Sequence, residues 1–292
     1  MATPAPPHGV PAGPLAVRWL AHDLPPQRAG ATTIGTLELE NAGTAAWRSR
    51  PGRDIHLSYH WLDPLGNPIV WAGAFILLPE RVAPGERINV WVTVRAPIPP
   101  GAYRLAFDLV NEGRYWFREL GNERLELDVD VLPGIAHRTL AVSVAPGDAD
   151  LAALTHAALA AQEESISPDG EGEATAYLAA GARPAADWSR RILDAHEEGF
   201  VAVGGAVEVE GGLLERRAAA KELAPWSAGF GRSPGWALPL LCPSLLAGTA
   251  GPGPGGLPAV DPAAVEGPTL CDGRIQVAVP ARAVRPGGRP SA

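Results

Sequence analysis

The sequence predicts two folded domains, an all-β sandwich followed by a smaller α/β domain. Residues 14–134 contain short segments of alternating apolar and polar side chains separated by turn residues, a pattern typical of half-buried strands. After residue 134, strand-like runs alternate with amphipathic helical segments, which favours an α/β arrangement. Glycine and proline, 34 and 31 of the 292 residues, are concentrated in loops and at both ends. We therefore expect disordered tails over 1–13 and, for the most part, 248–292, with the sandwich over 14–134 and the α/β domain over 135–247.

Composition and charge restrict the classes of function. The net charge is −8 at pH 7 and neither half carries a basic patch, so nucleic acid is not an expected partner. No run approaches the roughly 18 apolar residues of a membrane helix, and the N-terminus does not resemble a secretory signal. We therefore expect a cytoplasmic protein without a membrane span. Cys242 and Cys271 are then expected to be free thiols, with a disulfide between them as the alternative.

Short strands with one apolar face follow one another through the first half. They are expected over 15–20, 34–40, 55–61, 69–71, 88–94, 103–109 and 125–131. In the sixth of these, Leu105, Phe107 and Leu109 share one face with Tyr103, because side chains alternate along a strand. Strands of this number and spacing predict an immunoglobulin-like sandwich. Tyr103 follows Pro-Pro-Gly, where such sandwiches place a corner tyrosine that bonds to the backbone.

Five residues are candidates for ligand binding. Trp91 is out of phase with the valines around it, and Trp71 and Trp116 lie near turns. Glu112 and Tyr115 belong to the turn that precedes Trp116, which is the part of this region expected to face a partner. Half-exposed aromatic side chains suit stacking on a sugar or anchoring of another domain. Packing in the core or between domains is the alternative for the three tryptophans.

Two polar patterns resemble metal sites but have a simpler interpretation. His56 and His60 have the spacing of a metal-binding pair, yet on a strand they lie roughly 13 Å apart. Asp128 and Asp130 also alternate along a predicted strand. We expect both pairs to lie on solvated strand faces, and we expect no metal ligands and no catalytic residues.

The first half resembles immunoglobulin-like "four-tryptophan" domains. The segments that carry the resemblance are Asn41-Ala-Gly-Thr-Ala-Ala-Trp47, Ala83-Pro-Gly-Glu86 and Ala96-Pro-Ile-Pro-Pro-Gly-Ala-Tyr103. His60-Trp-Leu-Asp63 and Asp108-Leu-Val-Asn-Glu-Gly-Arg-Tyr-Trp-Phe117 are similar to bacterial versions appended to glycosyltransferases and other sugar-envelope proteins. The resemblance implies a domain that binds or positions a partner and is not catalytic.

The second half shows the pattern of a small parallel α/β sheet. Strands are expected over 140–144, 174–179 and 200–203, and helices over 151–160, 184–198 and 213–223. Asp148 or Asp150 is expected to cap the first helix.

This half resembles a shortened family 2 glycosyltransferase of the GT-A fold. The resemblance rests on Leu140-Ala-Val-Ser-Val-Ala-Pro146, Ala160-Ala-Gln162, Tyr177-Leu-Ala-Ala-Gly-Ala-Arg-Pro-Ala-Ala-Asp-Trp188 and Phe200-Val-Ala-Val-Gly-Gly-Ala-Val207. Where that family places its metal-binding Asp-x-Asp, this chain has Ala179, Ala180, Gly181 and Ala182, whose side chains offer no oxygen to a divalent cation. The resemblance therefore implies a degenerate pseudo-enzyme or docking unit without a cofactor.

Three hypotheses of function follow. The first is a cytoplasmic, non-catalytic accessory or binding protein of bacterial glycan or cell-envelope biosynthesis, with a glycan or an envelope-biosynthesis protein as partner. The second is a divergent glycosyltransferase that uses a nucleotide-sugar and a divalent cation. The third is a structural protein–protein interaction module.

Overall fold

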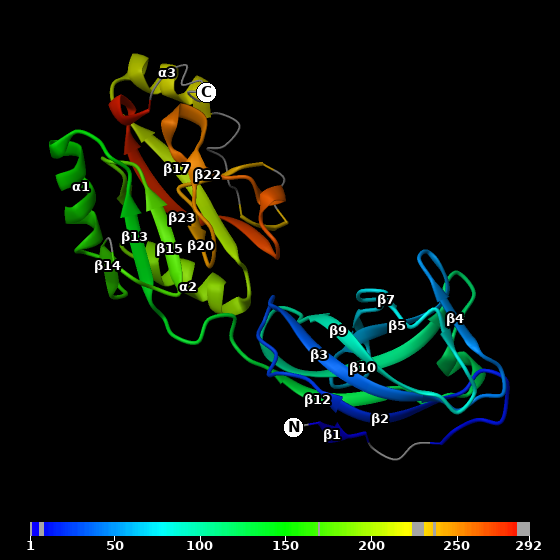
Figure 1. Cartoon of the computed structure of the whole chain (residues 1–292). Helices are drawn as coiled ribbons and strands as arrows, with labels where there is room; N and C mark the ends of the chain where they lie inside the picture. Colours follow the sequence, from blue (N-terminus) through cyan, green and yellow to red (C-terminus); the bar gives the residue numbers. More distant parts are fainter. Residues whose placement is uncertain (1, 6–8, 169, 224–230, 236–237, 285–292) are drawn as a thin grey trace. The chain divides into compact units, whose positions relative to one another are not determined.

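The computed structural model describes residues 2–5, 9–168, 170–223, 231–235 and 238–284. The chain forms two compact units, Met1–Leu132 and Pro133–Ala292, which are built mostly of strands (Figure 1). No helix in the described residues is long and apolar enough to cross a membrane.

The first unit consists of two sheets around one core. The first sheet is antiparallel and has the order β1-β2-β3-β9. Its strands are β1 (Thr3–Pro4), β2 (Val17–Asp23), β3 (Thr32–Asn41) and β9 (Arg87–Arg95). Ile88, Val90, Val92 and Val94 of β9 are buried and alternate with exposed side chains, as the sequence predicts.

The second sheet has β10 and β5 at its centre. Its order is β11-β10-β5-β4-β8; β12 also pairs with β10, and β6 and β7 pair with β5. The strands are β4 (Trp47–Arg50), β5 (Arg53–Leu62), β6 (Pro68–Val70), β7 (Ile76–Leu77), β8 (Arg81–Val82), β10 (Gly101–Asn111), β11 (Tyr115–Trp116) and β12 (Leu125–Val131). A short 3-10 helix, η1 (Phe117–Leu120), follows β11.

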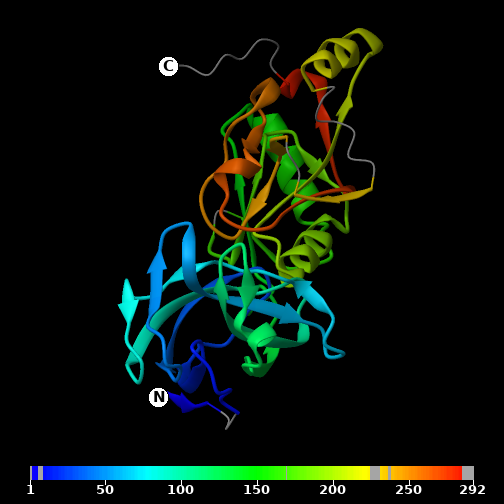
Figure 2. The same cartoon turned by 90° about the vertical axis from the view of Figure 1, so that its right-hand side faces the viewer.

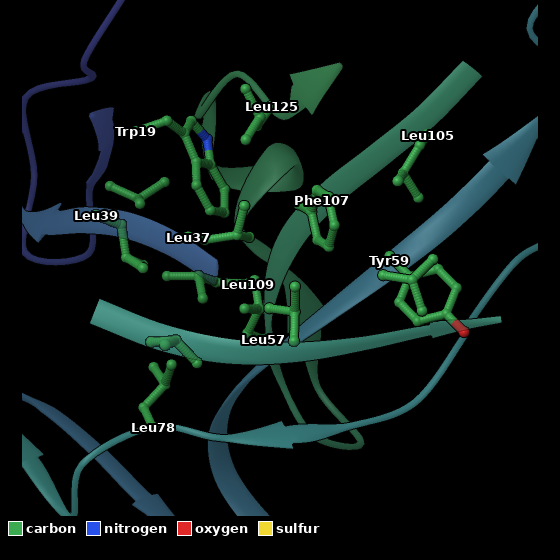
Figure 3. Close-up of a cluster of buried hydrophobic side chains, with 14 of the residues drawn as sticks. Trp19, Leu37, Leu39, Leu57, Tyr59, Leu78, Leu105, Phe107, Leu109 and Leu125 are labelled. Carbon is green, nitrogen blue, oxygen red and sulfur yellow. The ribbon is translucent and has the colours of Figure 1, made fainter. Parts of the chain in front are cut away.

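Apolar side chains of both sheets meet in the core (Figure 3). Leu37 of the first sheet and Leu57, Phe107 and Leu109 of the second are fully buried. The expected corner is confirmed, because the Tyr103 hydroxyl donates to the carbonyl oxygen of Pro99 at 2.7 Å. This core fixes which face of β5 and β10 points away from the first sheet.

The second unit is built on a mixed sheet with the order β14-β13-β15-β20-β17-β23-β16, and β18 also pairs with β23. A separate three-stranded sheet has the order β19-β22-β21. The strands are β13 (Leu140–Val144), β14 (Ile166–Pro168), β15 (Ala174–Leu178), β16 (Arg183–Pro184), β17 (Ala202–Glu210), β18 (Arg232–Pro234), β19 (Leu240–Leu241), β20 (Ser244–Leu245), β21 (Gly251–Pro252), β22 (Pro258–Val260) and β23 (Thr269–Pro280).

Three α-helices accompany these sheets. They are α1 (Ala149–Leu159), α2 (Trp188–Glu198) and α3 (Leu213–Leu223), and the 3-10 turns are η2 (Pro254–Gly256), η3 (Pro262–Ala264) and η4 (Ala281–Ala283). In the second view α3 follows the end of β17 (Figure 2). Trp188, Ile192 and Leu193 of α2 are buried.

The predicted fold class, an all-β immunoglobulin-like sandwich followed by a small α/β domain of GT-A type, is wrong. The chain is 44% strand and 17% helix with several curled sheets, and no separate α/β GT-A-like domain is evident in its described part. The elements expected at 140–144, 174–179 and 213–223 exist, but β20 lies antiparallel between β15 and β17. A local sequence pattern predicts a strand or a helix but not the strands with which it pairs. The antiparallel strand β20 between β15 and β17 was therefore not predicted.

The expected tail over 248–292 also differs from the structure. Its glycines and prolines suggested disorder, yet β23 pairs in parallel with β17 along nearly its whole length. Leu270, Ile275, Val277 and Val279 of β23 are buried. The expected 1–13 tail contains β1, which pairs with β2.

Candidate functional site

An aromatic cluster forms on the outer face of the second sheet, around His60 of β5. The ring centre of His60 is 4.6 Å from that of Trp71 and 4.5 Å from that of Trp116. The two indole rings are 6.0 Å apart. The Trp71 residue is 53% exposed, whereas His60 is buried. The cluster therefore presents aromatic surface to solvent above an inaccessible imidazole.

The local fold explains why these side chains meet. Trp71 follows the short strand β6, which pairs with β5. Trp116 lies on β11, opposite Val110 of β10, and β10 separates β11 from β5. The imidazole Nδ1 of His60 donates to the backbone carbonyl of Trp71, because a carbonyl oxygen only accepts.

The five predicted site residues are not all brought together. Trp71 and Trp116 meet around His60. Glu112 lies nearby, with its Oε2 3.6 Å from Nδ1 of His56, and the Tyr115 hydroxyl is 3.3 Å from the amide nitrogen of Asn111. Trp91, 73% exposed, lies on β9 of the first sheet and does not join the cluster. Ligand binding by these residues stays a prediction.

The outer face of β5 and β10 is buried and polar. His56, Ser58 and His60 of β5 and Asp108 of β10 are each at most 2% exposed. The prediction that His56 and His60 lie on a solvated face is therefore wrong. Alternation distinguishes the apolar and polar faces of a strand, but it does not show whether the polar face is covered by other parts of the chain. Here it is covered: the centre of the Phe75 ring lies 6.3 Å from that of His56. The exposed position of Asp128 and Asp130 is confirmed.

Two of these residues, Ser58 and Asp108, form a row across neighbouring strands together with Arg124. Ser58 pairs with Asp108, and Leu125, the first residue of β12, pairs with Phe107, so Arg124, immediately before β12, stands next to Asp108. Cross-strand partners point to the same face of a sheet. We call Arg124, Asp108 and Ser58 the polar row. Sequence reasoning missed this row, whose signal was that Ser58 and Asp108 share the polar phase of two predicted strands.

The polar row is incompletely hydrogen-bonded. Asp108 accepts from the N–H of Leu109 at 2.8 Å and from that of Arg118 at 3.4 Å. Arg124, whose side chain is 5% exposed, donates through Nη2 to Glu126 at 2.8 Å. Among the described residues, Ser58 Oγ and Arg124 Nε have no hydrogen-bond partner. Buried polar atoms without partners are rare and costly in folded proteins.

Burial shifts the protonation of the groups in this site. It raises the pKa of Asp108 to about 7, against the opposing effect of the two N–H donors and the nearby Arg124 and Arg118. It lowers the pKa of His60 to about 4, and the positive charges of Arg124 and Arg118 lower it further. At neutral pH, His60 is uncharged and Asp108 is divided between its two forms.

A cavity of about 1010 Å³ lies in the second unit, where the chain leaves β13 and β15. The two carboxylates among its lining residues, Asp148 and Asp261, already accept hydrogen bonds from backbone N–H groups. Asp148 accepts from the N–H groups of Asp150 and Leu151 and caps α1, as predicted, and Asp261 accepts from the N–H of Ala263. No group of three or more His, Cys, Asp and Glu side chains suited to a metal ion occurs within the described ranges.

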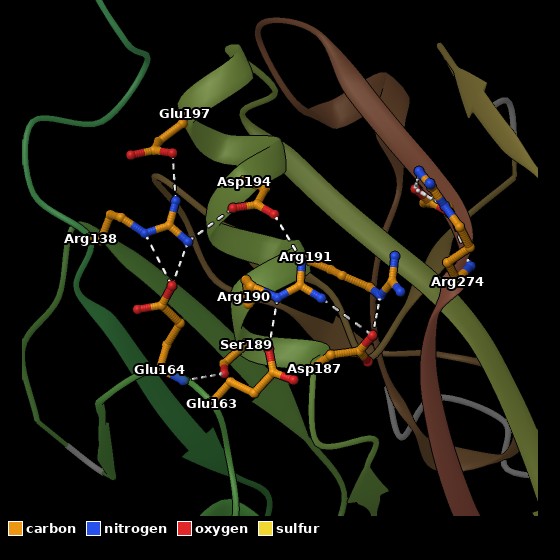
Figure 4. A network of polar contacts seen from close by, with 11 residues as sticks. Arg138, Glu163, Glu164, Asp187, Ser189, Arg190, Arg191, Asp194, Glu197 and Arg274 are labelled. Atoms are coloured by element: carbon orange, nitrogen blue, oxygen red, sulfur yellow. Dashed lines mark hydrogen bonds and ion pairs between the residues drawn. The ribbon is translucent and has the colours of Figure 1, made fainter.

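Ion pairs attach α2 to the preceding loops (Figure 4). Arg138 bonds to Glu164 at 2.6 Å and to Asp194 at 2.9 Å, and also contacts Glu197. These hydrogen bonds and charges raise the pKa of Arg138, although burial acts in the opposite direction. Arg190 bonds to Glu163 at 2.7 Å. The arginine and carboxylate charges of this network compensate one another, which indicates that the ion pairs stabilise the fold.

A buried histidine–serine pair connects α2 with β20. His196 Nε2 is 2.8 Å from Ser244 Oγ, and its Nδ1 is 2.7 Å from the carbonyl oxygen of Phe200. Nδ1 therefore carries the proton and the serine hydroxyl donates to Nε2. Both residues are completely buried, so a substrate cannot reach this pair. Cys242 and Cys271 are buried free thiols, and burial raises the pKa of Cys242 to about 12.

Comparisons with known proteins leave the function open. No family model and no curated protein matches the chain. The C-terminal domain of wzt is 8% identical and matches over 45% of this chain and 81% of that one, with a TM-score of 0.30. A CARDB domain from Pyrococcus furiosus, crystallised with di-metal ions, is 13% identical over 45% of this chain and 93% of that one, with a TM-score of 0.24.

A β-glucosidase from Listeria innocua in complex with gluconolactone is 14% identical, with a TM-score of 0.25. That match covers 39% of this chain and 15% of the glucosidase. Similarities at this level carry no functional argument. The function has to be inferred from the residues themselves.

Proposed function

We propose that this chain is a non-catalytic binding protein and that its first unit binds a carbohydrate through Trp71 and Trp116. The observation that carries the proposal is the aromatic cluster around the neutral, buried His60. A pyranose has an apolar C–H face and a polar rim of hydroxyl groups. Exposed indole surface suits the C–H face, and Glu112, whose carboxylate lies beside His56 on the same strand as His60, offers a polar group for the rim.

The proposal assigns no reaction to the site. The Nδ1 proton of His60 is held by the carbonyl of Trp71, and Trp71 and Trp116 flank its ring. General acid–base catalysis needs a group within reach of the substrate proton. Glycosyl transfer by a GT-A-like domain is not proposed, since the described residues show no separate α/β domain of that fold.

The wider role proposed is accessory binding in bacterial glycan or cell-envelope biosynthesis. Its support is the resemblance of 60–63 and 108–117 to domains appended to glycosyltransferases and sugar-envelope proteins. The partner would be the glycan itself or a protein that assembles it.

A glycan array followed by calorimetric titration tests this function. The full chain is expected to bind at least one glycan, and Trp71→Ala and Trp116→Ala are each expected to weaken binding at least tenfold. Trp91→Ala is the matched control, because it removes an exposed indole outside the cluster. If the array detects no glycan, or if Trp91→Ala weakens binding as much as the other two substitutions, the proposal is wrong.

A protein-interaction module is the second candidate. Large apolar side chains are unusually exposed in the segment that contains Trp71. They are Leu65, at 88%, and Ile69, Phe75 and Leu77, at about half. Clustered exposed apolar residues often mark protein interfaces. Leu65→Ser with Leu77→Ser would then abolish capture of a protein partner from a lysate of the source cells, whereas glycan binding would remain.

A further inference from the structure

We infer that β9 is the edge through which two copies of this chain associate, pairing antiparallel about a twofold axis at Val90. The inference goes beyond the proposed carbohydrate binding and does not depend on it. It rests on the hydrogen-bonding pattern of this one strand, on its lack of the features that normally protect a strand edge, and on the self-complementarity of its free segment.

β9 is an outer strand of the first sheet, and among the described strands it pairs with β3 alone. Two hydrogen bonds at its ends show which of its backbone groups face β3. The N–H of Ala96 donates to the carbonyl oxygen of Ala31 at 2.9 Å, and the N–H of Asn41 donates to that of Glu86 at 3.0 Å. Because hydrogen-bonded pairs alternate along an antiparallel ladder, the even-numbered residues of β9 bond to β3. The odd-numbered residues point their N–H and C=O groups away from it.

The outward backbone groups of Arg95 are already bonded and mark one end of the free segment. The Arg95 N–H donates to the hydroxyl of Tyr59 at 3.0 Å, and its carbonyl oxygen accepts from Nε1 of Trp61 at 2.8 Å. Within the described residues, no hydrogen bond reaches the outward backbone groups of the odd-numbered residues over 87–93. We call 87–93 the open edge, and Val90 is its central residue.

The open edge lacks the features that normally keep a strand edge from pairing. Charged side chains in mid-strand, proline, bulges and short length are the usual protections. Residues 88–94 include no charged residue, proline or glycine, and their register with β3 contains no bulge. By contrast, β12, an outer strand of the second sheet, carries Glu126, Asp128 and Asp130. β1, at the other side of the first sheet, has two residues, one of which is Pro4.

The open edge is complementary to itself. In an antiparallel pair centred on Val90, Arg87 lies opposite Thr93 of the second copy, and Asn89 lies opposite Trp91. Residues whose backbone groups point toward each other in this way exchange both N–H···O=C bonds. Every outward N–H and C=O group of the open edge therefore has a partner in this register.

Neighbouring registers fit less well. A pair centred on Trp91 would place Arg87 opposite Arg95 of the second copy, which brings like charges together, and the backbone groups of Arg95 are already bonded. A shift in the other direction would leave Thr93 opposite the turn that precedes β9. The twofold axis makes the contact isologous. Both copies of the open edge are then used, so association stops at two chains.

Side chains on both faces of β9 suit the register centred on Val90. On the exposed face, Trp91 is 73% exposed, and the two Trp91 side chains would be diagonal neighbours across the new pair, within reach of each other. Their contact would remove apolar surface from water. On the core face, Val90 would lie opposite Val90 and Ile88 opposite Val92, so apolar contacts would continue from one core to the other.

Sedimentation equilibrium of the full chain over a wide range of protein concentration tests the inference. The wild-type chain is expected to form a reversible dimer and no larger species. Trp91→Lys places a charge in the middle of the edge, and Asn89→Pro removes an outward N–H but no bond to β3. Each is expected to raise the dimer dissociation constant about tenfold or more, because each change occurs twice in the dimer. Asn89→Ala keeps the N–H and is the matched control, with the wild-type dissociation constant.

Amide hydrogen exchange locates the contact. The N–H groups of Asn89, Trp91 and Thr93 should exchange slowly in the dimer and rapidly after dilution, whereas that of Val90, which is bonded to β3, should exchange slowly in both states. Circular dichroism checks the fold of each variant, and if Asn89→Pro does not fold, Trp91→Lys decides the result.

Four results would overturn the inference. They are a chain that is monomeric at every concentration, a dimer unchanged in both edge variants, a dimer without protection at the three outward N–H groups, and protection that arises in a monomeric chain only when a different protein is added. The last result would assign the open edge to another partner. None of these outcomes bears on the carbohydrate site, whose own test uses Trp71 and Trp116.

Discussion

The imidazole of His60 and the indole of Trp116 are in contact across a strand to which neither belongs. Their ring centres are 4.5 Å apart, while their strands, β5 and β11, lie on opposite sides of β10. The contact spans the outer face of β10, where Asp108 is located. The second sheet of the first unit therefore has a buried outer layer in addition to the core, and this layer holds titratable groups whose effects can be measured.

Asp108→Asn is expected to change how the stability of the first unit depends on pH. The folded-state pKa of Asp108 is about 7, above its ordinary value of 3.8. Protonation therefore stabilises the folded chain at low pH, and this contribution is lost as the pH rises through 7. Between pH 5 and 8 the loss amounts to about 3 kcal/mol. In urea unfolding monitored by tryptophan fluorescence, the difference in free energy of unfolding between the wild type and Asp108→Asn should fall by this amount over that range, because other titrating groups contribute equally to both proteins.

His60 opposes Asp108 over part of this range. Its folded-state pKa is about 4, below the ordinary 6.5, so its contribution to stability is present above pH 6.5 and is lost as the pH falls toward 4. The two effects partly cancel in the wild type. Asp108→Asn should therefore lose stability on acidification from pH 6.5 to 4, and equal pH slopes in both proteins would contradict the assignment.

The second unit has a similar histidine without a carboxyl partner. Burial lowers the pKa of His196 to about 4. The stability of this unit should therefore fall as the pH drops from 6.5 to 4, by about 3 kcal/mol. His196→Gln lacks the titrating group and should abolish this slope, at the cost of lower stability at pH 7. His137→Gln, at an exposed position, is the control and should retain the slope.

The apolar faces of the strands were predicted well from the sequence. The chain segments that cover the polar face of β5 were not predicted. The alternation in β9 and the hydroxyl of Tyr103 were predicted correctly, because both follow from local periodicity and one turn. His56 and His60 were placed in solvent, because nothing in their own strand reveals that Phe75, Trp71 and Trp116 pack above it. Such contacts depend on residues that are distant in sequence.

The same limit explains the errors in the second unit. The helix cap at Asp148 is local and was identified. β20 has two residues, too few for a periodicity, and β23 lies between stretches rich in glycine and proline. Of the candidate site, the sequence indicated Trp71 and Trp116 but not His60 or the polar row.

Gly73→Ala is expected to destabilise the first unit by about 2 kcal/mol, as overpacking typically does. A Cβ atom at Gly73 would lie 2.2 Å from Cζ of Tyr59, and Tyr59 is held by the N–H of Arg95 donating to its hydroxyl at 3.0 Å. Either the Tyr59 ring or the backbone around Gly73 must shift. Gly13→Ala is the control, because nothing lies within 4 Å of its added Cβ. Thermal unfolding with no difference between the two variants would contradict this packing.

Ser58→Ala is expected to stabilise the chain against unfolding. The Ser58 hydroxyl is fully buried and has no hydrogen-bond partner in the described structure, and a buried group left unsatisfied costs about 1–3 kcal/mol. Alanine removes the polar atom and leaves a gap of only one oxygen, so the free energy of unfolding should rise by about 1 kcal/mol. Chemical denaturation of both proteins without ligand measures this difference. A decrease in stability would mean that the hydroxyl has a hydrogen-bond partner in the folded protein and would contradict this prediction.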